Sequence, residues 1–207
     1  MNKLNIIFVL PSVSRKFTGV YEVSRNLALE LQNLDCFVDV HSFVDEFTQD
    51  DLPNWKPIVP KTYEPVGVFS LRLPFFCSVI NSNSSVGHIH SLWSSTSIAL
   101  YFWSLFWNKP YVFTSNAYLF DSALRQSGFK KKAARYLIFN RIINKADCIQ
   151  VNTMNEYDAI RNLGFKNPIC LIPNGVNLPD LSIDRTSPWR HIQCTQNKKV
   201  LLNHVTR

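Results

Sequence analysis

Apolar and polar residues follow two periodic patterns along this chain, one typical of strands and one typical of helices. Residues 4–10 are almost all apolar, as expected for a strand covered on both faces of a parallel sheet. From Val20 to Leu34 apolar side chains recur every three or four residues, which predicts a helix lying on that sheet. Residues 37–43 alternate and predict a second strand. The chain therefore opens with the strand, helix and strand of a right-handed crossover unit.

The same succession continues as far as residue 172. Further strands are predicted at residues 86–90, 110–115, 148–152 and 169–172, with a weaker candidate at 66–73. Helices are predicted at residues 75–80, 94–107, 130–145 and 155–163, the last of them ended by Gly164. Residues 44–65 hold four prolines and predict irregular structure. This alternation indicates a Rossmann-like, doubly wound and mainly parallel α/β sheet.

The character of the sequence changes after the last predicted strand. That strand runs into Pro173, Asn174 and Gly175, which predict a tight turn. Residues 176–197 are polar and lack periodicity, and residues 198–202 resemble the first strand of something new. We therefore expect one Rossmann-like domain over residues 1–178, followed by a linker and the start of a C-terminal domain over residues 179–207.

Composition narrows the class of protein. With 207 residues, 46% of them hydrophobic, the chain can bury a core. A net charge of +7 allows anionic partners such as phosphate groups, acidic lipids or nucleic acid, and an ordinary basic surface is the alternative. The five cysteines are widely spaced and include no C-x-x-C pair, which argues against a disulfide framework or zinc site and for a reducing compartment.

Neither of the two longest apolar runs predicts a membrane or export segment. The first ends at Pro11 without a small-residue cleavage site, so it indicates a strand and not a signal peptide. The second, residues 98–107, is about half as long as a bilayer span requires and indicates a buried helix.

Candidate chemistry lies in the loops after the strands, because ligands bind at the carboxyl ends of parallel strands. The first loop enters its helix through Gly19, which would let backbone N–H groups approach an anion; a plain loop-to-helix joint is the alternative. His88 and His90 share one face of a predicted strand, but no third ligand follows at a suitable spacing, so no metal site is expected. We expect His88 to be a hydrogen-bonded structural residue and His90, with Trp93, to form a wall for a sugar ring or a base.

The loop after residue 115 makes a family resemblance visible. Residues 114–132, TSNAYLFDSALRQSGFKKK, resemble the pattern T-P-H-G-M-L-D-P-x-A-L-x-x-S-x-x-K-K in the N-terminal domain of family 4 glycosyltransferases, which have the GT-B fold. The resemblance covers residues 1–176. Its other parts are Pro11 with Thr18-Gly19, His90 to Ser94 (H-x-L-W-S), Ala146-Asp147 (A-D), Asn155 to Tyr157 (S-E-x-E), and Ile172 to Val176, which matches I-P-N-G-V without change.

The resemblance implies the acceptor half of a glycosyltransferase. Such an enzyme would transfer a hexose from a nucleotide-sugar to a polysaccharide or lipid-linked saccharide in cell-surface glycan biosynthesis. No cofactor or metal is implied, since the nucleotide-sugar is a substrate, and no catalytic residue is assigned. The candidate acceptor-binding residues are Gly19, His90, Trp93, Asn116 and Asp121, and the candidate hinge toward a donor domain is Pro173, Asn174 and Gly175.

Two departures from the family pattern affect these expectations. Asn116 stands where the family has a histidine; it can hydrogen-bond a sugar hydroxyl but cannot take up a proton near neutral pH. The sequence also ends before the family's donor-binding residues, so we expect the main donor site to be missing and the chain to be incomplete. The alternatives are an inactive remnant, or a non-catalytic subunit that binds acceptor or membrane and pairs with a separate donor-domain chain. A nucleotide-binding domain of another α/β class is a third interpretation, disfavoured by the missing glycine fingerprint.

The predicted helix at residues 130–145 is basic, and a solvated face is its simplest interpretation. Because many relatives act on lipid-linked acceptors, the resemblance adds a second one, peripheral contact with the anionic inner membrane surface. Nucleic-acid binding is not expected, since the lysines are not interleaved along a groove-reading element. We therefore expect a cytoplasmic protein, with peripheral membrane contact through this helix as a further hypothesis.

Overall fold

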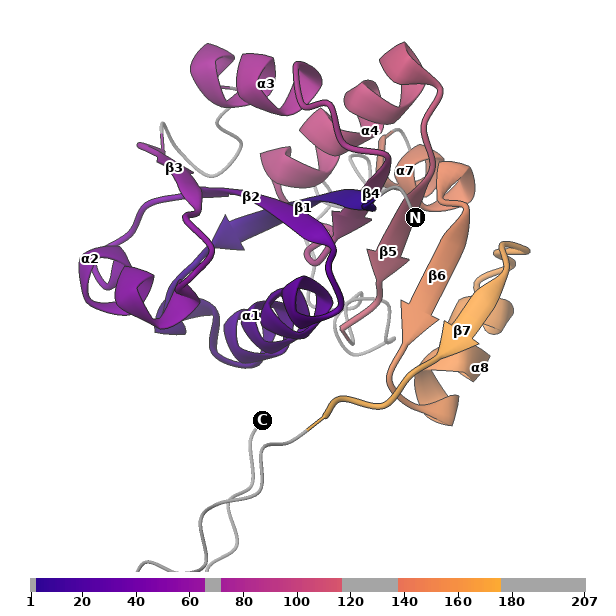
Figure 1. The fold of residues 1–207 in the computed structure, drawn as a ribbon. Helices are drawn as coiled ribbons and strands as arrows, with labels where there is room; N and C mark the ends of the chain where they lie inside the picture. The colour runs from indigo at the N-terminus through magenta and orange to yellow at the C-terminus, as the bar shows by residue number, and fades with distance from the viewer. Residues whose placement is uncertain (1–2, 66–71, 117–137, 176–207) are drawn as a thin grey trace, which may run out of the picture. The chain divides into compact units, whose positions relative to one another are not determined.

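The computed structural model of this chain describes residues 3–65, 72–116 and 138–175. Seven strands form one sheet in the order β3-β2-β1-β4-β5-β6-β7, and all neighbouring strands are parallel (Figure 1). The sheet is the Rossmann-like, doubly wound architecture predicted from the sequence. The strands are β1 (Asn5–Ser12), β2 (Phe37–Phe43), β3 (Lys61–Tyr63), β4 (Val86–Ile89), β5 (Tyr111–Thr114), β6 (Cys148–Val151) and β7 (Ile169–Leu171).

Helices connect successive strands, as right-handed crossovers require. The short ones are η1 (Arg15–Phe17), α2 (Thr48–Asp51), η2 (Leu52–Trp55) and α7 (Asn140–Lys145). The longer ones are α1 (Thr18–Asn33), α3 (Leu73–Ile80), α4 (Ser95–Trp107) and α8 (Met154–Asn162). By its contacts the chain divides into Met1–Asn174, which contains all of these elements, and Gly175–Arg207.

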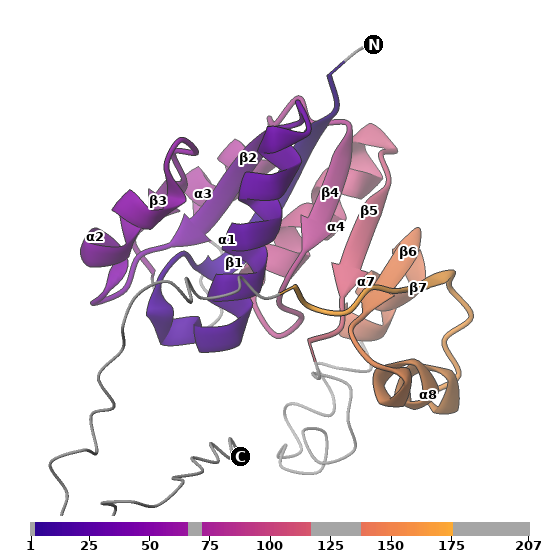
Figure 2. The same ribbon diagram turned by 60° about the horizontal axis from the view of Figure 1, so that its bottom comes forward.

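Strand β1 lies inside the sheet and is apolar on both faces. Phe8 and Leu10 pack toward α1 together with Tyr21 and Trp55. The intervening Ile7 and Val9 belong to a larger cluster on the opposite face, to which α3, α4, α7 and α8 contribute. Figures 1 and 2 show α1 on one side of the sheet and α3 and α4 on the other. Burial on both faces explains why β1 is a continuous apolar run and does not alternate.

Helix α4 is the most deeply packed helix of the larger cluster. Leu100 and Trp103 are fully buried, and the Trp103 indole N–H donates to the Ser82 carbonyl oxygen at 3.0 Å. The helix ends at Asn108, which adopts a left-handed conformation that asparagine tolerates better than most residues. The expectation of a buried core helix is met only on the inner side of α4, because Phe102, Leu105, Phe106 and Trp107 are 47–70% exposed. No helix among the described residues has both the length and the apolar character needed to cross a bilayer.

Three local expectations were wrong or incomplete. Residues 44–65 are not irregular throughout, since they hold α2, η2 and the edge strand β3. The weak strand at residues 66–73 falls mostly outside the described residues, and Leu73 begins α3. Of the helix predicted at residues 130–145, only the final part is described; Ile142 is buried there, whereas Ile138 is 41% exposed. Residues 138–139 form a π-helical turn and α7 begins at Asn140, so the α-helical register does not extend to residue 138.

The order of the strands determines where a ligand site can lie. From β1 the chain builds β2 and β3 on one side, and it returns to place β4 on the other. Loops after β1 and β4 therefore diverge at the same sheet edge, which is the usual ligand position in open α/β sheets. All seven strands point the same way, so the loops after β2, β5 and β6 lie at this edge as well.

A polar cluster around Asp39 on β2 ties the sheet together. The Asp39 carboxylate accepts hydrogen bonds from His41 Nε2 at 2.9 Å, Lys61 Nζ at 2.9 Å and Ser82 Oγ at 3.2 Å. Burial alone would raise the pKa of Asp39, but the hydrogen bonds and charges of His41 and Lys61 outweigh it and lower this pKa to about 2. The ionised carboxylate therefore links β2, β3 and the segment before β4.

We predict that Asp39→Asn destabilises the fold in a pH-dependent way. At pH 7 the free energy of unfolding should fall by about 1–3 kcal/mol, because three donors lose a charged acceptor. An aspartate pKa lowered by folding contributes stability above the unfolded pKa, near 4, and this contribution is lost as pH falls toward 2. Urea unfolding followed by circular dichroism at pH 7, 4 and 2.5 should show the two proteins converging in acid. A difference that stays constant with pH would contradict this account.

Candidate functional site

Two polar clusters of different kinds lie at the carboxyl edge of the sheet. One fixes the loop between β1 and α1 against the connection that follows β2. The other joins the ends of β4, β5 and β6. The first cluster has its polar groups paired with one another, and the second retains buried polar atoms that have no partner in the described part of the chain. We therefore interpret the first cluster as holding the loop in position and the second as a candidate site for binding a ligand.

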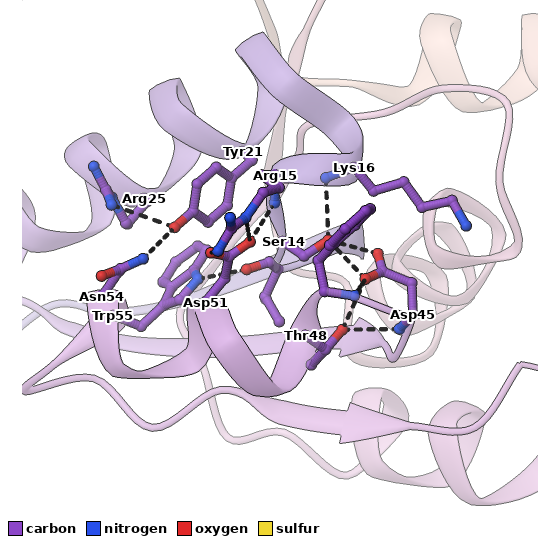
Figure 3. Close-up of polar contacts among 12 residues, drawn as sticks. Ser14, Arg15, Lys16, Tyr21, Arg25, Asp45, Thr48, Asp51, Asn54 and Trp55 are labelled. Atoms are coloured by element: carbon purple, nitrogen blue, oxygen red, sulfur yellow. Dashed lines mark hydrogen bonds and ion pairs between the residues drawn. The ribbon is translucent and has the colours of Figure 1, made fainter.

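The loop after β1 is attached to Asp45, just beyond β2 (Figure 3). Asp45 accepts hydrogen bonds from the hydroxyls of Ser12 and Ser14, the latter at 2.8 and 2.6 Å to its two oxygens. It also accepts from the Phe47 amide at 2.9 Å and from the Thr48 hydroxyl at 3.2 Å. Burial would raise the pKa of Asp45, and these donors instead lower it. Asp45 is therefore a saturated anionic anchor for the loop.

A second carboxylate, Asp51, holds the next part of the same loop. Its side chain is 3% exposed and accepts from the Arg15 amide at 2.8 Å and from the Arg15 guanidinium at 2.5–3.0 Å (Figure 3). The Trp55 indole N–H adds a bond to the Val13 carbonyl oxygen at 2.9 Å. We call the contacts of Asp45, Asp51 and Trp55 with the loop the loop clamp. Paired carboxylate and guanidinium groups hold a backbone with defined orientation.

The loop clamp also changes the electrostatic character of the loop. Arg15 is paired with Asp51, and Lys16 is paired with Glu46 at 2.7 Å. The two cationic side chains that the sequence places beside Gly19 therefore already have carboxylate partners. An anion at this loop would compete with those partners, so the geometry favours the plain joint over the phosphate-binding alternative.

Gly19 lies in the first turn of α1, beyond the loop clamp. It is exposed, and a Cβ atom added to it would meet no atom within 4 Å. Packing within the described residues therefore does not require a glycine here. A ligand that approaches this turn closely would require one, so Gly19 remains a candidate for contact with the acceptor.

The second cluster begins with the two histidines of β4. His88 Nε2 lies 2.6 Å from the hydroxyl oxygen of Thr114, which in turn lies 3.3 Å from Gln150 Oε1. This is the hydrogen-bonded structural arrangement expected for His88. Burial lowers its pKa to about 3. His88 is therefore a neutral member of a chain of hydrogen bonds across β4, β5 and β6.

His90 lies on the same face, one residue beyond β4, as the alternation predicted. Its ring centroid is 4.0 Å from that of His88 and 4.6 Å from that of Phe8, and the residue is 1% exposed. Burial, with His88 beside it, lowers the pKa of His90 well below its usual value. Among the described residues neither ring nitrogen has a hydrogen-bond partner.

Asn116, which stands where the resembling family has a histidine, lies beside His90. It follows β5 in a left-handed conformation with φ of 40°. Its Nδ2 donates to the His90 carbonyl oxygen at 3.0 Å, and its Oδ1 accepts from Asn152 Nδ2 at 3.4 Å. The structure thus brings two of the predicted residues together and adds Asn152, which the sequence analysis missed. Its position directly after β6 was the signal that could have identified it.

The remaining predicted site residues are placed differently. Trp93 is half-buried and packs its ring on Phe139, with centroids 4.8 Å apart, so it contributes to the core on the α4 side. Asp121 lies outside the described residues. Pro173 and Asn174 follow β7 directly and Gly175 begins the second unit, and the hinge role of these three residues stays a prediction.

Two acidic residues of the family motifs have structural roles. Asp147 of the A-D motif accepts from the Tyr111 amide at 3.0 Å and so fixes the start of β5. Glu156 of the helix α8 motif accepts from the Asn152 amide at 2.8 Å, while Thr153 caps the helix. In the described part of the chain, no group of three or more histidine, cysteine or acidic side chains could hold a metal ion.

Comparison with known proteins agrees with this architecture. A family model described as Glycosyltransferase Family 4 matches residues 17–179. Among solved structures, Anabaena Alr3699/HepE in complex with UDP-glucose is 18% identical with a TM-score of 0.64, and the match covers 93% of this chain and 49% of that one. A putative UDP-N-acetylglucosamine 2-epimerase from Listeria monocytogenes is 13% identical with a TM-score of 0.55, covering 81% and 43%. No curated protein sequence matches the chain.

The chain thus spans about half the length of the solved structures that it resembles. At these identities the likeness establishes the fold alone, and it extends to proteins named as epimerases as well as to HepE. The chemistry must therefore be argued from the residues at the carboxyl edge.

We predict opposite effects of adding one methyl group at two glycines. Gly19→Ala should leave the free energy of unfolding unchanged or raise it by about 0.4–1 kcal/mol, because the site is open and helical. Gly87→Ala should lower it by about 1–3 kcal/mol, because the new Cβ would lie 2.8 Å from Cδ2 of the buried Leu100. Chemical denaturation measures both. Marked destabilisation by Gly19→Ala would show that packing, and not a ligand, requires this glycine.

We also predict that Asp51→Ala releases the loop clamp without unfolding the sheet. The Arg15 amide loses its acceptor, so hydrogen exchange in a peptide covering residues 12–20 should become about tenfold faster. Peptides from β5 and β6 should exchange as before. Asp50→Ala is the matched control, since this neighbouring acid is exposed and should leave the loop protected. Equal exchange in the two variants would mean that Asp51 does not hold the loop.

Proposed function

The chain belongs to glycosyltransferase family 4, and on this premise we propose that it forms the acceptor-binding side of a glycosyltransferase. The reaction is transfer of a hexose from a nucleotide-sugar to a polysaccharide or lipid-linked saccharide in cell-surface glycan biosynthesis. One observation carries the proposal: His90, Asn116 and Asn152 gather at the carboxyl edge, and both His90 ring nitrogens and Asn152 Oδ1 are buried without a partner among the described residues. Buried polar groups in native proteins are nearly always bonded, so these atoms require a partner such as a ligand hydroxyl or a water molecule.

In this proposal the nucleotide-sugar donor is bound by a different domain. HepE binds UDP and UDP-glucose in the structures to which this chain is similar, which supports a nucleotide-sugar as donor. A second domain, continuous with this chain or in a separate polypeptide, holds that donor opposite the acceptor. Stabilisation of charge on the departing diphosphate is the largest expected catalytic effect, and it falls to that domain. The described residues contribute orientation and binding of the acceptor.

Peripheral membrane contact through residues 130–145 is part of the same proposal. Within the described end of this segment, Arg141 is exposed and Lys145 is half-buried, while Ile142 and Ile143 are buried. A basic outer side on a helix anchored in the core suits an anionic lipid surface. We therefore propose that the reaction takes place on the cytoplasmic side of the membrane, where a lipid-linked acceptor is accessible.

A non-catalytic acceptor-binding subunit is the second candidate, and Asn116 is the observation that favours it. An amide cannot exchange a proton with the substrate near neutral pH, so Asn116 cannot perform general acid or base catalysis. It can still orient a hydroxyl by hydrogen bonding. The two candidates therefore agree on binding and differ on transfer.

We predict that deletion of the gene in its native host lowers incorporation of hexose from labelled nucleotide-sugar into the polysaccharide and lipid-linked fractions of isolated membranes. Complementation with the wild-type gene should restore incorporation. Asn116→Ala should restore only about a half to a tenth of it, as loss of one hydrogen bond to the acceptor implies. Asn155→Ala, at an exposed amide on α8, is the control and should restore it fully. Unchanged incorporation after deletion would reject a role of the chain in this transfer, whether as enzyme or as acceptor-binding subunit.

A further inference from the structure

We propose that Cys148 and Cys170 form an oxidation-sensitive pair of thiols, which a peroxide converts into a disulfide between β6 and β7. Both cysteines are reduced in the structure, and Cys148 Sγ donates to Cys170 Sγ at 3.5 Å. This inference is independent of the proposed acceptor role of the chain. It depends on the contact between the two sulfur atoms, on their access from solvent and on the position of β7.

The pairing of β6 with β7 brings the two thiols together. Cys170 lies opposite Gln150, and Cys148 precedes Gln150 by two residues, so the two cysteines share one face and lie diagonally across neighbouring strands. Their sulfur atoms are in contact although the residues are 22 positions apart in sequence. A disulfide bond is about 2.0 Å long, so oxidation requires a further approach. β7 has three residues and is the last strand in the sheet order, which leaves it free to make a small shift.

The two thiols are accessible to a small oxidant, since both cysteines are half-buried. Ile149 belongs to the larger core cluster and Ile169 packs against it, on the side of the sheet that α8 covers. Because side chains alternate along a strand, Cys148 and Cys170 lie on the opposite face from this cluster. They therefore differ from cysteines enclosed in a core, which are chemically inert.

The reaction is balanced with hydrogen peroxide as the oxidant. The Cys148 sulfur attacks one peroxide oxygen and the O–O bond breaks, which gives a sulfenic acid and hydroxide; the hydroxide takes up the thiol proton and leaves as water. The Cys170 sulfur then attacks the Cys148 sulfur, the S–O bond breaks, and a second water leaves with the Cys170 proton. Two electrons pass from the two sulfur atoms to the peroxide, and one S–S bond replaces two S–H bonds.

The order of the two steps follows from the surroundings of Cys170. Burial and the neighbouring Cys148 raise the pKa of Cys170 to about 11, so this thiol is protonated at neutral pH and is a poor nucleophile toward a peroxide. The first oxidation is therefore assigned to Cys148. Because Cys170 is held in contact with Cys148, the second step has a high effective concentration, which offsets its small thiolate fraction.

The disulfide restrains the strand through which the chain leaves the sheet. β7 continues directly into Ile172, whose amide donates to the Val151 carbonyl oxygen of β6 at 2.9 Å, and then into Pro173 and Asn174 of the predicted hinge. A covalent link between β6 and β7 opposes separation of this strand pair. Oxidation should therefore protect the backbone around Ile172 from local opening.

Peptide mapping of the purified chain tests the inference. Dilute, reduced and folded protein is treated with hydrogen peroxide, the remaining thiols are blocked, and trypsin is added without reductant. Cleavage after lysine and arginine places Cys148 in residues 146–161 and Cys170 in residues 167–185. We expect these two peptides to be joined in at least about tenfold excess over any other pairing of the five cysteines, and to separate on reduction. No joined peptides, or similar amounts of several pairings, would overturn the inference.

Oxidation in urea is the matched control for the role of the fold. Cys148 and Cys194 are separated from Cys170 by similar lengths of chain, so the unfolded protein should join Cys170 to each of them in similar amounts. The same preference for Cys148 in urea as in the folded protein would show that the contact between β6 and β7 is not its cause.

Two variants locate the effect. Cys148→Ser should abolish the joined peptides, whereas Cys77→Ser, at an exposed cysteine on α3, should leave their yield unchanged. An equal loss in both variants counts against the assignment to Cys148. If Cys148→Ser does not fold, the comparison of folded and urea-treated wild-type protein decides alone.

Hydrogen exchange tests the effect on β7. A peptide covering residues 168–174 should exchange at least about threefold more slowly in the oxidised protein, and reduction should restore the original rate. Disulfide formation with unchanged exchange would reject the restraint on β7.

Discussion

Parallel pairing of all seven strands is the constraint on which the rest of this structure depends. It requires a crossover after every strand, so the sheet is covered by helices and its inner strands are apolar on both faces. It also brings every strand's carboxyl end to one edge. Residues as far apart in sequence as Ser12, Asp45, Asn116 and Asn152 lie at that edge for this reason alone.

The polar groups at the edge divide by how completely they are bonded. In the loop clamp, Asp45 and Asp51 accept several hydrogen bonds each, and the nearby cations are paired with carboxylates. Such a cluster holds backbone in place and has little capacity left for a ligand. Around His90 and Asn152, by contrast, buried atoms lack partners among the described residues. Leaving buried polar atoms unpaired costs free energy, which is tolerated where a ligand completes the bonding.

Family membership and local chemistry answer different questions about this chain. The family and the solved structures establish the fold, but the same fold occurs in HepE and in proteins named as epimerases, and the chain spans only about half of their length. The residues at the edge decide how an acceptor could be held. Asn116, beside a buried and neutral His90, places an amide where the family has a protonatable ring.

Among the described elements, the sequence by itself determined every strand except β3, the four longer helices and the loops worth examining, because these follow from local periodicity and from the rule that ligands bind beyond parallel strands. The run at residues 4–10, the helical stripe after Val20 and Gly164 with φ of 86° were all predicted in this way. Only the tertiary structure showed that Arg15 and Lys16 are neutralised by Asp51 and Glu46, because those partners lie about thirty residues away. The tertiary structure also showed that Trp93 packs toward the core and that Asn152 is hydrogen-bonded to Asn116. The contact between the two asparagines depends on the order of the strands in the sheet, which no local sequence pattern contains.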